Sequence, residues 1–389
     1  MKPIQVWDYR DEYEDERAEI THSVETVLRS GRLILGPQVT RFESEFAAYC
    51  GVRHGVGVNS GTDAIFLGLK ALDVGPGDEV VTVANTAVPT VSAICATGAT
   101  PRFVDVLPDT YLMNVAHLEA AITPQTKCIL PVHLFGQCAD MKAVMAVAKR
   151  HGLRVMEDCA QSHGAEQNGV RCGAMADVSA FSFYPTKILG TYGDGGMVCT
   201  DDPDIAARLK RLRMYGMDEP RTYSEDFGLK SHYYSLEAGY NSRLDELHAA
   251  ILLTKLPKIG AYLERRRVIA ARYADQLSDT DLVLPKTAYG NAHGYYLYVC
   301  RHPRRDAIIA ELAERDIFVK VDYPWPIHFM PAYESLGYRE GDLPETERAA
   351  REILSLPMYP TLKTEDQDRV CSSLHEILAT FGAAGGKPD

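Results

Sequence analysis

The chain has 389 residues, 46% of them hydrophobic, and a formal net charge of -12. This length is too great for one compact core and predicts two domains. The negative charge argues against nucleic acid or an anionic membrane as a partner, although a pocket of backbone amides could still bind a phosphate. The sequence has no run of about 20 apolar residues, as a membrane-spanning helix would need, and its acidic N-terminal stretch has no signal-peptide core, so we expect a cytoplasmic protein.

Short apolar runs alternate with helical patterns between about residues 50 and 200. Strands are expected in HGVGVNSG, GDEVVTV, TPRFVDV, TKCILPVHLFG, LRVMEDC, DVSAFSFY and GGMVCT. Helices are expected in TDAIFLGLKAL, AVPTVSAICATG, DMKAVMAVAKRHG and DPDIAARLKRLR. This rhythm predicts a mostly parallel α/β sheet, whose ligands bind at the carboxyl ends of the strands.

The pattern changes after about residue 250. A long charged helical stretch, DELHAAILLTKLPKIGAYLERRRVIAARYADQL, is followed by the expected strand HGYYLYVCRHP and the expected helix RDAIIAELAERD. We therefore predict a large domain over residues 1–255, with an N-terminal arm, and a smaller C-terminal α+β domain over residues 256–389.

The nine cysteines are an odd number, and none forms a C-x-x-C pair. Five of them lie among apolar neighbours: Cys50, Cys95, Cys128, Cys159 and Cys199. Such positions are typical of reduced, buried thiols rather than of a disulfide framework. The histidines show no H-E-x-x-H motif and no ligand-like spacing with the cysteines, so we expect no metal site.

Lys187 stands between the aromatic strand of AFSFYPTK and the glycine-rich turn GDGG. A lone lysine at such a place usually extends its ammonium group to solvent along an apolar stem. The alternative is a desolvated amine that acts as a nucleophile or forms a Schiff base. The polar residues at the other strand ends must decide between the two.

Several of those strand ends carry groups that could bind a cofactor. In VGVNSGTDA, Gly61 and Thr62 lie where a strand turns into a helix, so free amides there could bind an anion, although an ordinary helix cap is the simpler explanation of this stretch alone. A Rossmann loop is disfavoured, because GVGVNSG has one residue too many for G-x-G-x-x-G. Ser182 offers a hydroxyl group to a phosphate. Asn241 precedes a helix in GYNSRLDELHAA, where a helix cap is again the simpler explanation.

Asp158 ends the otherwise apolar strand of LRVMEDCAQSHGA, with Gln161 just beyond it. A carboxylate in this setting must be paired or protonated, so Asp158 should face either an arginine or the protonated pyridine nitrogen of a cofactor. An amine, an aspartate, a phosphate cradle and a glycine-rich loop around one flat ring are what pyridoxal phosphate requires. The combined pattern therefore predicts this cofactor.

The motifs SGTDA, VMEDCAQSHGA, FSFYPTKILGTYGDGGMV, GYNSRLDELHAA and YPWPIHFMPAY follow in this order over residues 60 to 333. Together they strongly resemble the DegT/DnrJ/EryC1/StrS family of sugar aminotransferases. The resemblance implies an aspartate-aminotransferase-like fold (PLP-dependent transferase type I) of the α/β class, with a mostly parallel central sheet. It also implies a homodimer whose active sites are shared between subunits.

The resemblance assigns roles to individual residues. Lys187 would bind the cofactor's aldehyde and Asp158 would pair with its pyridinium, which makes these two the catalytic residues. Gln161 would lie at the cofactor's ring hydroxyl. The residues that would bind the cofactor's phosphate are Gly61, Thr62 and Ser182, with Asn241 from the neighbouring subunit. Those that would line the sugar pocket are Tyr184, Tyr323 and His328.

One position departs from the family pattern. Many members carry an aromatic residue that stacks on the cofactor where this chain has Ala87, in NTAVPT. We therefore assign no stacking residue.

The segments VWDYRDEYEDER, VANTAVPTVSAI and VDYPWPIH look most similar to the daunosamine-type branch, whose members aminate C3 of dTDP-linked deoxysugars in antibiotic pathways. We expect transfer of an amino group from L-glutamate to the C3 keto group of a dTDP-keto-deoxysugar. One alternative is a C4 aminotransferase acting on a dTDP-4-keto-6-deoxyhexose. A sugar dehydratase of the same fold is a weaker alternative, because such dehydratases carry histidine where Lys187 stands. The intact lysine also disfavours a non-catalytic or NAD-binding module.

Overall fold

The computed structural model describes residues 2–217 and 234–384. At its centre lies a seven-stranded sheet in the order β1-β9-β8-β5-β4-β2-β3. The strands from β8 to β3 run parallel to one another, whereas β9 runs antiparallel to both of its neighbours, β8 and β1. In sheet order the bounds are β1 (His54–Val58), β9 (Gly196–Thr200), β8 (Val178–Ser182), β5 (Arg154–Asp158), β4 (Thr126–Ile129), β2 (Glu79–Val83) and β3 (Thr100–Val104). The expected mostly parallel α/β sheet is confirmed.

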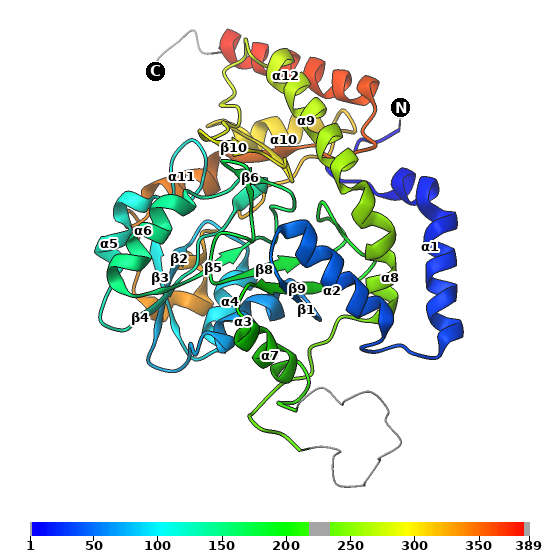
Figure 1. The fold of residues 1–389 in the computed structure, drawn as a ribbon. Coiled ribbons are helices and arrows are strands. Elements are labelled where there is room, and N and C mark those ends of the chain that lie inside the picture. Colours follow the sequence, from blue (N-terminus) through cyan, green and yellow to red (C-terminus); the bar gives the residue numbers. More distant parts are fainter. Residues whose placement is uncertain (1, 218–233, 385–389) are drawn as a thin grey trace.

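Helices cover the sheet because its strands are apolar on both faces; all five residues of β8 and of β9 are buried. The helices that precede, connect or follow the sheet strands are α1 (Arg10–Ser30), α2 (Pro37–Cys50), α3 (Gly61–Ala71), α4 (Val88–Ala96), α5 (Leu118–Ala121), α6 (Met141–His151), α7 (Pro203–Leu212) and α8 (Glu246–Lys255). Figure 1 shows α1 alongside α8 at one side of the sheet.

A buried carboxylate ties two of these helices together. Glu246, at the start of α8, accepts hydrogen bonds from the backbone N–H groups of Gly36, Gln38 and Val39 at 2.8, 2.9 and 2.7 Å. These amides lie at the beginning of α2, where no carbonyl within the helix can pair with them. The carboxylate also meets the positive end of the α2 dipole, so it stabilises the helix from a distant part of the chain.

A second apolar core lies above the central sheet in the view of Figure 1. Its helices are α9 (Ile259–Gln276), α10 (Arg305–Ala313) and α12 (Thr364–Ala384), and its strand pair is β11 (Tyr298–Arg301) with β12 (Ile353–Leu356). The N-terminal segment joins this core, because Ile4 is buried in it and forms a backbone bridge with Ile317. Helix α11 (Pro344–Glu352) precedes β12, and a small sheet is formed by β6 (Glu166–Gln167), β7 (Val170–Arg171) and β10 (Asn291–Ala292).

The long helical stretch predicted after residue 244 is divided into α8, a 3₁₀ turn at Leu256–Lys258 and α9. The predicted domain division between residues 255 and 256 falls at this turn and stays a prediction. The expected strands and helices from residue 54 to residue 212 are all present. Helices α1 and α2 were not predicted from the sequence.

The five cysteines named above are free thiols, but Cys95 is exposed, not buried. Cys138 and Cys172 form a disulfide that the sequence analysis missed. The two residues are 34 positions apart, and Cys172 directly follows the hairpin of β6 and β7. Within residues 2–217 and 234–384, no helix combines the length and hydropathy needed to cross a membrane.

Candidate active site

A cavity of about 350 Å³ opens where several sheet strands end. Its lining comes from the segments that follow β1, β2, β4, β5 and β8, and from the loop that leads into β9. The lining residues are Ser60, Gly61, Thr62, Ile65, Thr86, Ala87, Pro89, Thr90, Val132, Asp158, Ala160, Gln161, Ser182, Tyr184, Lys187 and Asp194. The carboxyl ends of the parallel strands thus meet at one site, as the fold class requires.

The first wall of this cavity is the beginning of α3. Ser60 caps the helix by accepting a hydrogen bond from the N–H of Asp63 at 3.1 Å, while the amides of the first turn have no partner within the helix. Gly61 lies so close to Ser182 that a Cβ atom there would come within 2.5 Å of the serine Cβ. Free amides, the helix dipole and nearby hydroxyl groups are the features that could bind an anion at this end of the cavity.

Asp158 lies across the cavity at the end of β5 and is only 4% exposed. Its Oδ2 accepts a hydrogen bond from the Thr90 hydroxyl at 2.8 Å, and its Oδ1 accepts one from the N–H of Ala160 at 3.1 Å. Burial raises the pKa of this carboxyl group, and the two hydrogen bonds only partly oppose the effect. A cation in the cavity would keep Asp158 ionised.

Lys187 enters the cavity from the loop between β8 and β9. Its Nζ lies 4.6 Å from the centre of the Tyr296 ring, and the Tyr296 hydroxyl is 2.9 Å from the hydroxyl of Thr186. The ring attracts the ammonium group through a cation–π contact. Tyr296 therefore holds Lys187 without a salt bridge. An amine so placed can add to a carbonyl group in the cavity.

Gln161 is held from two sides. Its Oε1 accepts a hydrogen bond from the backbone N–H of Phe135 at 2.8 Å, and its Nε2 donates to the hydroxyl of Tyr323 at 2.5 Å. The rings of Phe135 and Tyr323 stack at 6.2 Å with an interplanar angle of 14°. The amide therefore has a fixed orientation at the cavity wall.

Comparison with known proteins agrees with this geometry. Residues 14–375 match the model of the DegT/DnrJ/EryC1/StrS aminotransferase family. The chain belongs to this family. It is an aminotransferase.

One curated relative is the dTDP-3-amino-3,4,6-trideoxy-alpha-D-glucose transaminase of Micromonospora megalomicea subsp. nigra, which is 51% identical over 96% of this chain and 98% of the relative. Among solved structures, S. venezuelae DesV superposes with a TM-score of 0.91 at 42% identity, covering 100% of both chains. NtdA from Bacillus subtilis, solved with bound cofactor PMP, superposes with a TM-score of 0.85 at 32% identity over 94% of this chain and 82% of NtdA. These likenesses confirm the expected fold class.

Most residues that the sequence analysis singled out in this aminotransferase line the cavity. They are Gly61, Thr62, Asp158, Gln161, Ser182, Tyr184 and Lys187. Tyr184 is 51% exposed, and it therefore lies at the mouth of the cavity. Tyr323 is not part of the lining, but its hydroxyl contacts the lining residue Gln161.

The other two residues lie elsewhere on this chain. His328 is fully buried and its Nε2 lies 3.4 Å from Glu347 Oε1, away from the cavity lining; burial lowers the pKa of this histidine. Asn241 is exposed and forms a backbone bridge with Met214. The sugar-pocket role of His328 therefore lacks a contact with the cavity within this chain, and the phosphate role of Asn241 would need a second subunit.

Several residues that shape the site carried no recognisable signal in the sequence. Thr90, which holds Asp158, lies in the NTAVPT stretch, but only the missing aromatic residue at Ala87 drew attention to that stretch. Tyr296, under the Lys187 amine, is one of several tyrosines in an expected strand. Phe135 acts through its backbone N–H, which any residue type except proline would provide.

His133, Glu157 and Cys159 form a buried cluster whose potential ligand atoms lie within 4.8 Å of one another. Hydrogen bonds already occupy it: the N–H groups of Gly173 and Met175 donate to Glu157, whose Oε2 is also 2.8 Å from His133 Nε2. The N–H of Ala139 donates to His133 Nδ1, which leaves the proton on Nε2 and makes it the donor to Glu157. We interpret the cluster as a structural hydrogen-bond network. The expectation of no metal site stays a prediction.

Proposed function

We propose that this aminotransferase uses pyridoxal 5'-phosphate to transfer an amino group from L-glutamate to the C3 keto group of a dTDP-linked deoxysugar. The observation that carries the proposal is the lining of one 350 Å³ cavity by the Lys187 amine, the Asp158 carboxylate and the anion site at the start of α3. A phosphorylated pyridine aldehyde would need one such group for its aldehyde, one for its ring nitrogen and one for its phosphate.

The donor set fits this cofactor chemically. The phosphate would be held by the first-turn amides at Gly61 and Thr62 and by the Ser182 hydroxyl. The ring nitrogen would face Asp158, whose burial favours a cationic partner. When bound, the cofactor supplies an electron sink for the carbon atom that loses its proton.

The residues of the chain would do the rest of the chemistry. The Lys187 amine would bind the cofactor's aldehyde and, once released by the incoming amino group, would move the proton to and from the substrate carbon. Asp158 would keep the ring nitrogen protonated throughout. Over the whole cycle L-glutamate leaves as its 2-oxo acid, and the keto group of the sugar is replaced by an amino group, so no other oxidant or reductant is consumed.

The choice of C3 rests on the relative from M. megalomicea, whose name specifies a dTDP-3-amino sugar, and on the daunosamine-type motifs. A C4 aminotransferase on a dTDP-4-keto-6-deoxyhexose is the alternative, since it needs only a rotated sugar in the same cavity. Lys187 disfavours the dehydratase alternative. We propose a role in antibiotic or other secondary-metabolite sugar biosynthesis, and a location in the cytoplasm.

The proposed enzyme is a homodimer with shared active sites. Asn241 supports this, because it is exposed and lies outside the cavity of its own chain. Reaching the phosphate from a neighbouring subunit would give this amide the role that the family resemblance implies.

The deciding experiment has two stages. Borohydride reduction of the yellow protein followed by peptide mapping should place the cofactor on Lys187, and Lys187→Arg should remove the label. Incubation with L-glutamate and dTDP-3-keto and dTDP-4-keto sugars should then give an amino sugar whose nitrogen is at C3 by NMR. A C4 amine would overturn the regiochemistry alone, whereas a label on another residue would overturn the site.

A further inference from the structure

The hydrogen bonds around Gln161 determine which way its amide points. The backbone N–H of Phe135 can only donate, so the atom of Gln161 that faces it must be the oxygen Oε1. The nitrogen Nε2 must then face the hydroxyl of Tyr323. The orientation follows from chemistry, because the flipped amide would set two donors against each other.

Tyr323 thereby uses one of the two hydrogens on Gln161 Nε2 and leaves the other free. Gln161 lines the cavity and is only 5% exposed, so its remaining hydrogen can serve only a group in or beside the cavity. Because Oε1 is turned toward the N–H of Phe135, the group that the amide offers to the cavity is its free N–H donor.

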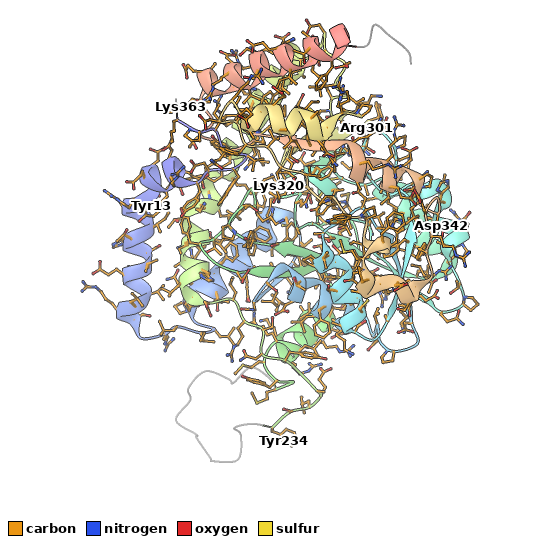
Figure 2. The ribbon with its side chains drawn as sticks, turned by 180° about the vertical axis from the view of Figure 1, so that it is seen from behind. Tyr13, Tyr234, Arg301, Lys320, Asp342 and Lys363 are labelled. Carbon is orange, nitrogen blue, oxygen red and sulfur yellow. A yellow bond between two sulfur atoms is a disulfide. The ribbon has the colours of Figure 1, made fainter. Side chains whose placement is uncertain are left out.

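The two partners of Gln161 are themselves held in unusual backbone conformations. Phe135 has φ +59° and Tyr323 has φ +66°, in the left-handed region that is strained for a bulky residue. The neighbouring Asp322 is 6% exposed, accepts a hydrogen bond from Ser355 at 2.7 Å and pairs with Lys320 at 2.8 Å. Lys320, labelled in Figure 2, forms a backbone bridge with Ser355 of β12, so the segment before Tyr323 is tied to that strand.

We infer that Tyr323 is a positioning residue that acts through Gln161, and that the pair directs a single N–H donor at the cofactor's ring oxygen. The inference rests on the proposed function, and it changes the role of Tyr323 from a wall of the sugar pocket to a support for the cofactor. A donor at this place favours the ionised ring oxygen.

This geometry has a spectroscopic consequence. With the cofactor bound to Lys187, a donor at the ring oxygen would favour the form in which the Lys187 nitrogen has lost its proton, because that nitrogen could then no longer donate to the oxygen. Loss of the donor should raise the pH at which that proton leaves. The charged and titratable groups around the pair are Asp158, Lys187, Tyr296 and Asp322, and a change of Tyr323 to phenylalanine leaves all of them in place.

The experiment compares the pH titration of the visible cofactor absorbance in wild type, Tyr323→Phe, Gln161→Ala and the double variant. One hydrogen bond to an ionised group corresponds to a shift of about one pH unit. We expect an upward shift of this size in both single variants and no further shift in the double variant. Tyr333→Phe is the matched control, because it removes a tyrosine hydroxyl 3.0 Å from Ser92 outside the cavity, and it should titrate as wild type.

An unshifted titration in Tyr323→Phe, or shifts that add in the double variant, would overturn the inference. Gln161→Asn, whose shorter side chain cannot reach both partners, should show the same upward shift and serves if Tyr323→Phe does not fold. Failure of the proposed function would look different: the wild-type protein itself would then bind no coloured cofactor at Lys187.

Discussion

Replacing Asp158 with asparagine removes a charge and keeps the shape of the side chain. The asparagine oxygen can keep the bond from the Ala160 N–H. The Thr90 hydroxyl can turn to accept from the new amide and donate to Thr86, whose hydroxyl lies 2.9 Å away. We therefore expect Asp158→Asn to fold with its local hydrogen bonds intact.

The loss should fall on the cationic ring that we propose opposite Asp158. Two unit charges about 4 Å apart attract by about 4 kcal/mol at an effective dielectric constant of about 20, and each tenfold in rate corresponds to about 1.4 kcal/mol. The half-reaction with L-glutamate, followed by stopped-flow absorbance, should slow by about 10³-fold. Thr90→Val is the control, since it removes a hydrogen bond to the same carboxylate but no charge, and it should slow the reaction far less.

Thermal unfolding gives a second readout of the same variant. Burial raises the pKa of Asp158 above that of an unfolded aspartate, so in the cofactor-free protein this group favours folding at acidic pH, and that contribution is lost as the pH rises through the raised pKa. Asp158→Asn should therefore unfold at a higher temperature than wild type near neutral pH when the cofactor is absent, with the difference fading at acidic pH. With the cofactor bound the order should reverse.

A half-reaction rate close to wild type would refute this reasoning. So would a stability change of the same sign with and without cofactor. Either result would mean that Asp158 meets no charge in the cavity and serves only its bonds to Thr90 and Ala160.

Two further predictions concern the phosphate end of the cavity. Gly61→Ala should weaken cofactor binding at least about tenfold in an absorbance titration, because its Cβ would displace Ser182. The control Gly260→Ala, whose Cβ would have nothing within 4 Å, should bind the cofactor as wild type does. Equal affinities of the two variants would exclude Ser182 as a phosphate ligand. Asn241→Asp should weaken cofactor retention, because it sets a like charge against the phosphate. Mixing this variant with Lys187→Ala should restore part of the activity through subunit exchange. A fully active monomer in sedimentation would contradict the shared site.

Local sequence patterns were enough to predict the sheet. Runs such as VSAFS and GMVCT are apolar throughout because both faces of their strands are buried, and that signal needs no knowledge of distant residues. Helix α1 lacks such a signal. Only three of its 21 residues are buried, Glu16, Ile20 and Val27, so its apolar stripe is too thin to show a clear period.

The placement of Asp158 and Lys187 in one cavity was predictable, because each stands where a strand ends. The site was not predictable where the role depends on a contact between distant segments. Gln161 and Tyr323 are 162 positions apart, and nothing in the spacing of either motif indicates that the two side chains meet. Thr90 and Asp158 are 68 positions apart, and here too only the folded chain reveals the partner.

The antiparallel direction of β9 has a consequence for how the site forms. Because β9 runs antiparallel directly beside β8, the loop that carries Lys187 starts and ends at the same end of these two strands. A parallel neighbour would have required a crossover connection to the opposite end of the strands. The pairing of β8 with β9 closes only the short Lys187 loop, so it costs little loop-closure entropy. The pairing of β9 with β1 joins distant parts of the chain and costs more. We expect the lysine loop to be among the early elements of this sheet to form during folding, while Tyr323, brought in by a later segment of the chain, completes the site only after the second core has assembled.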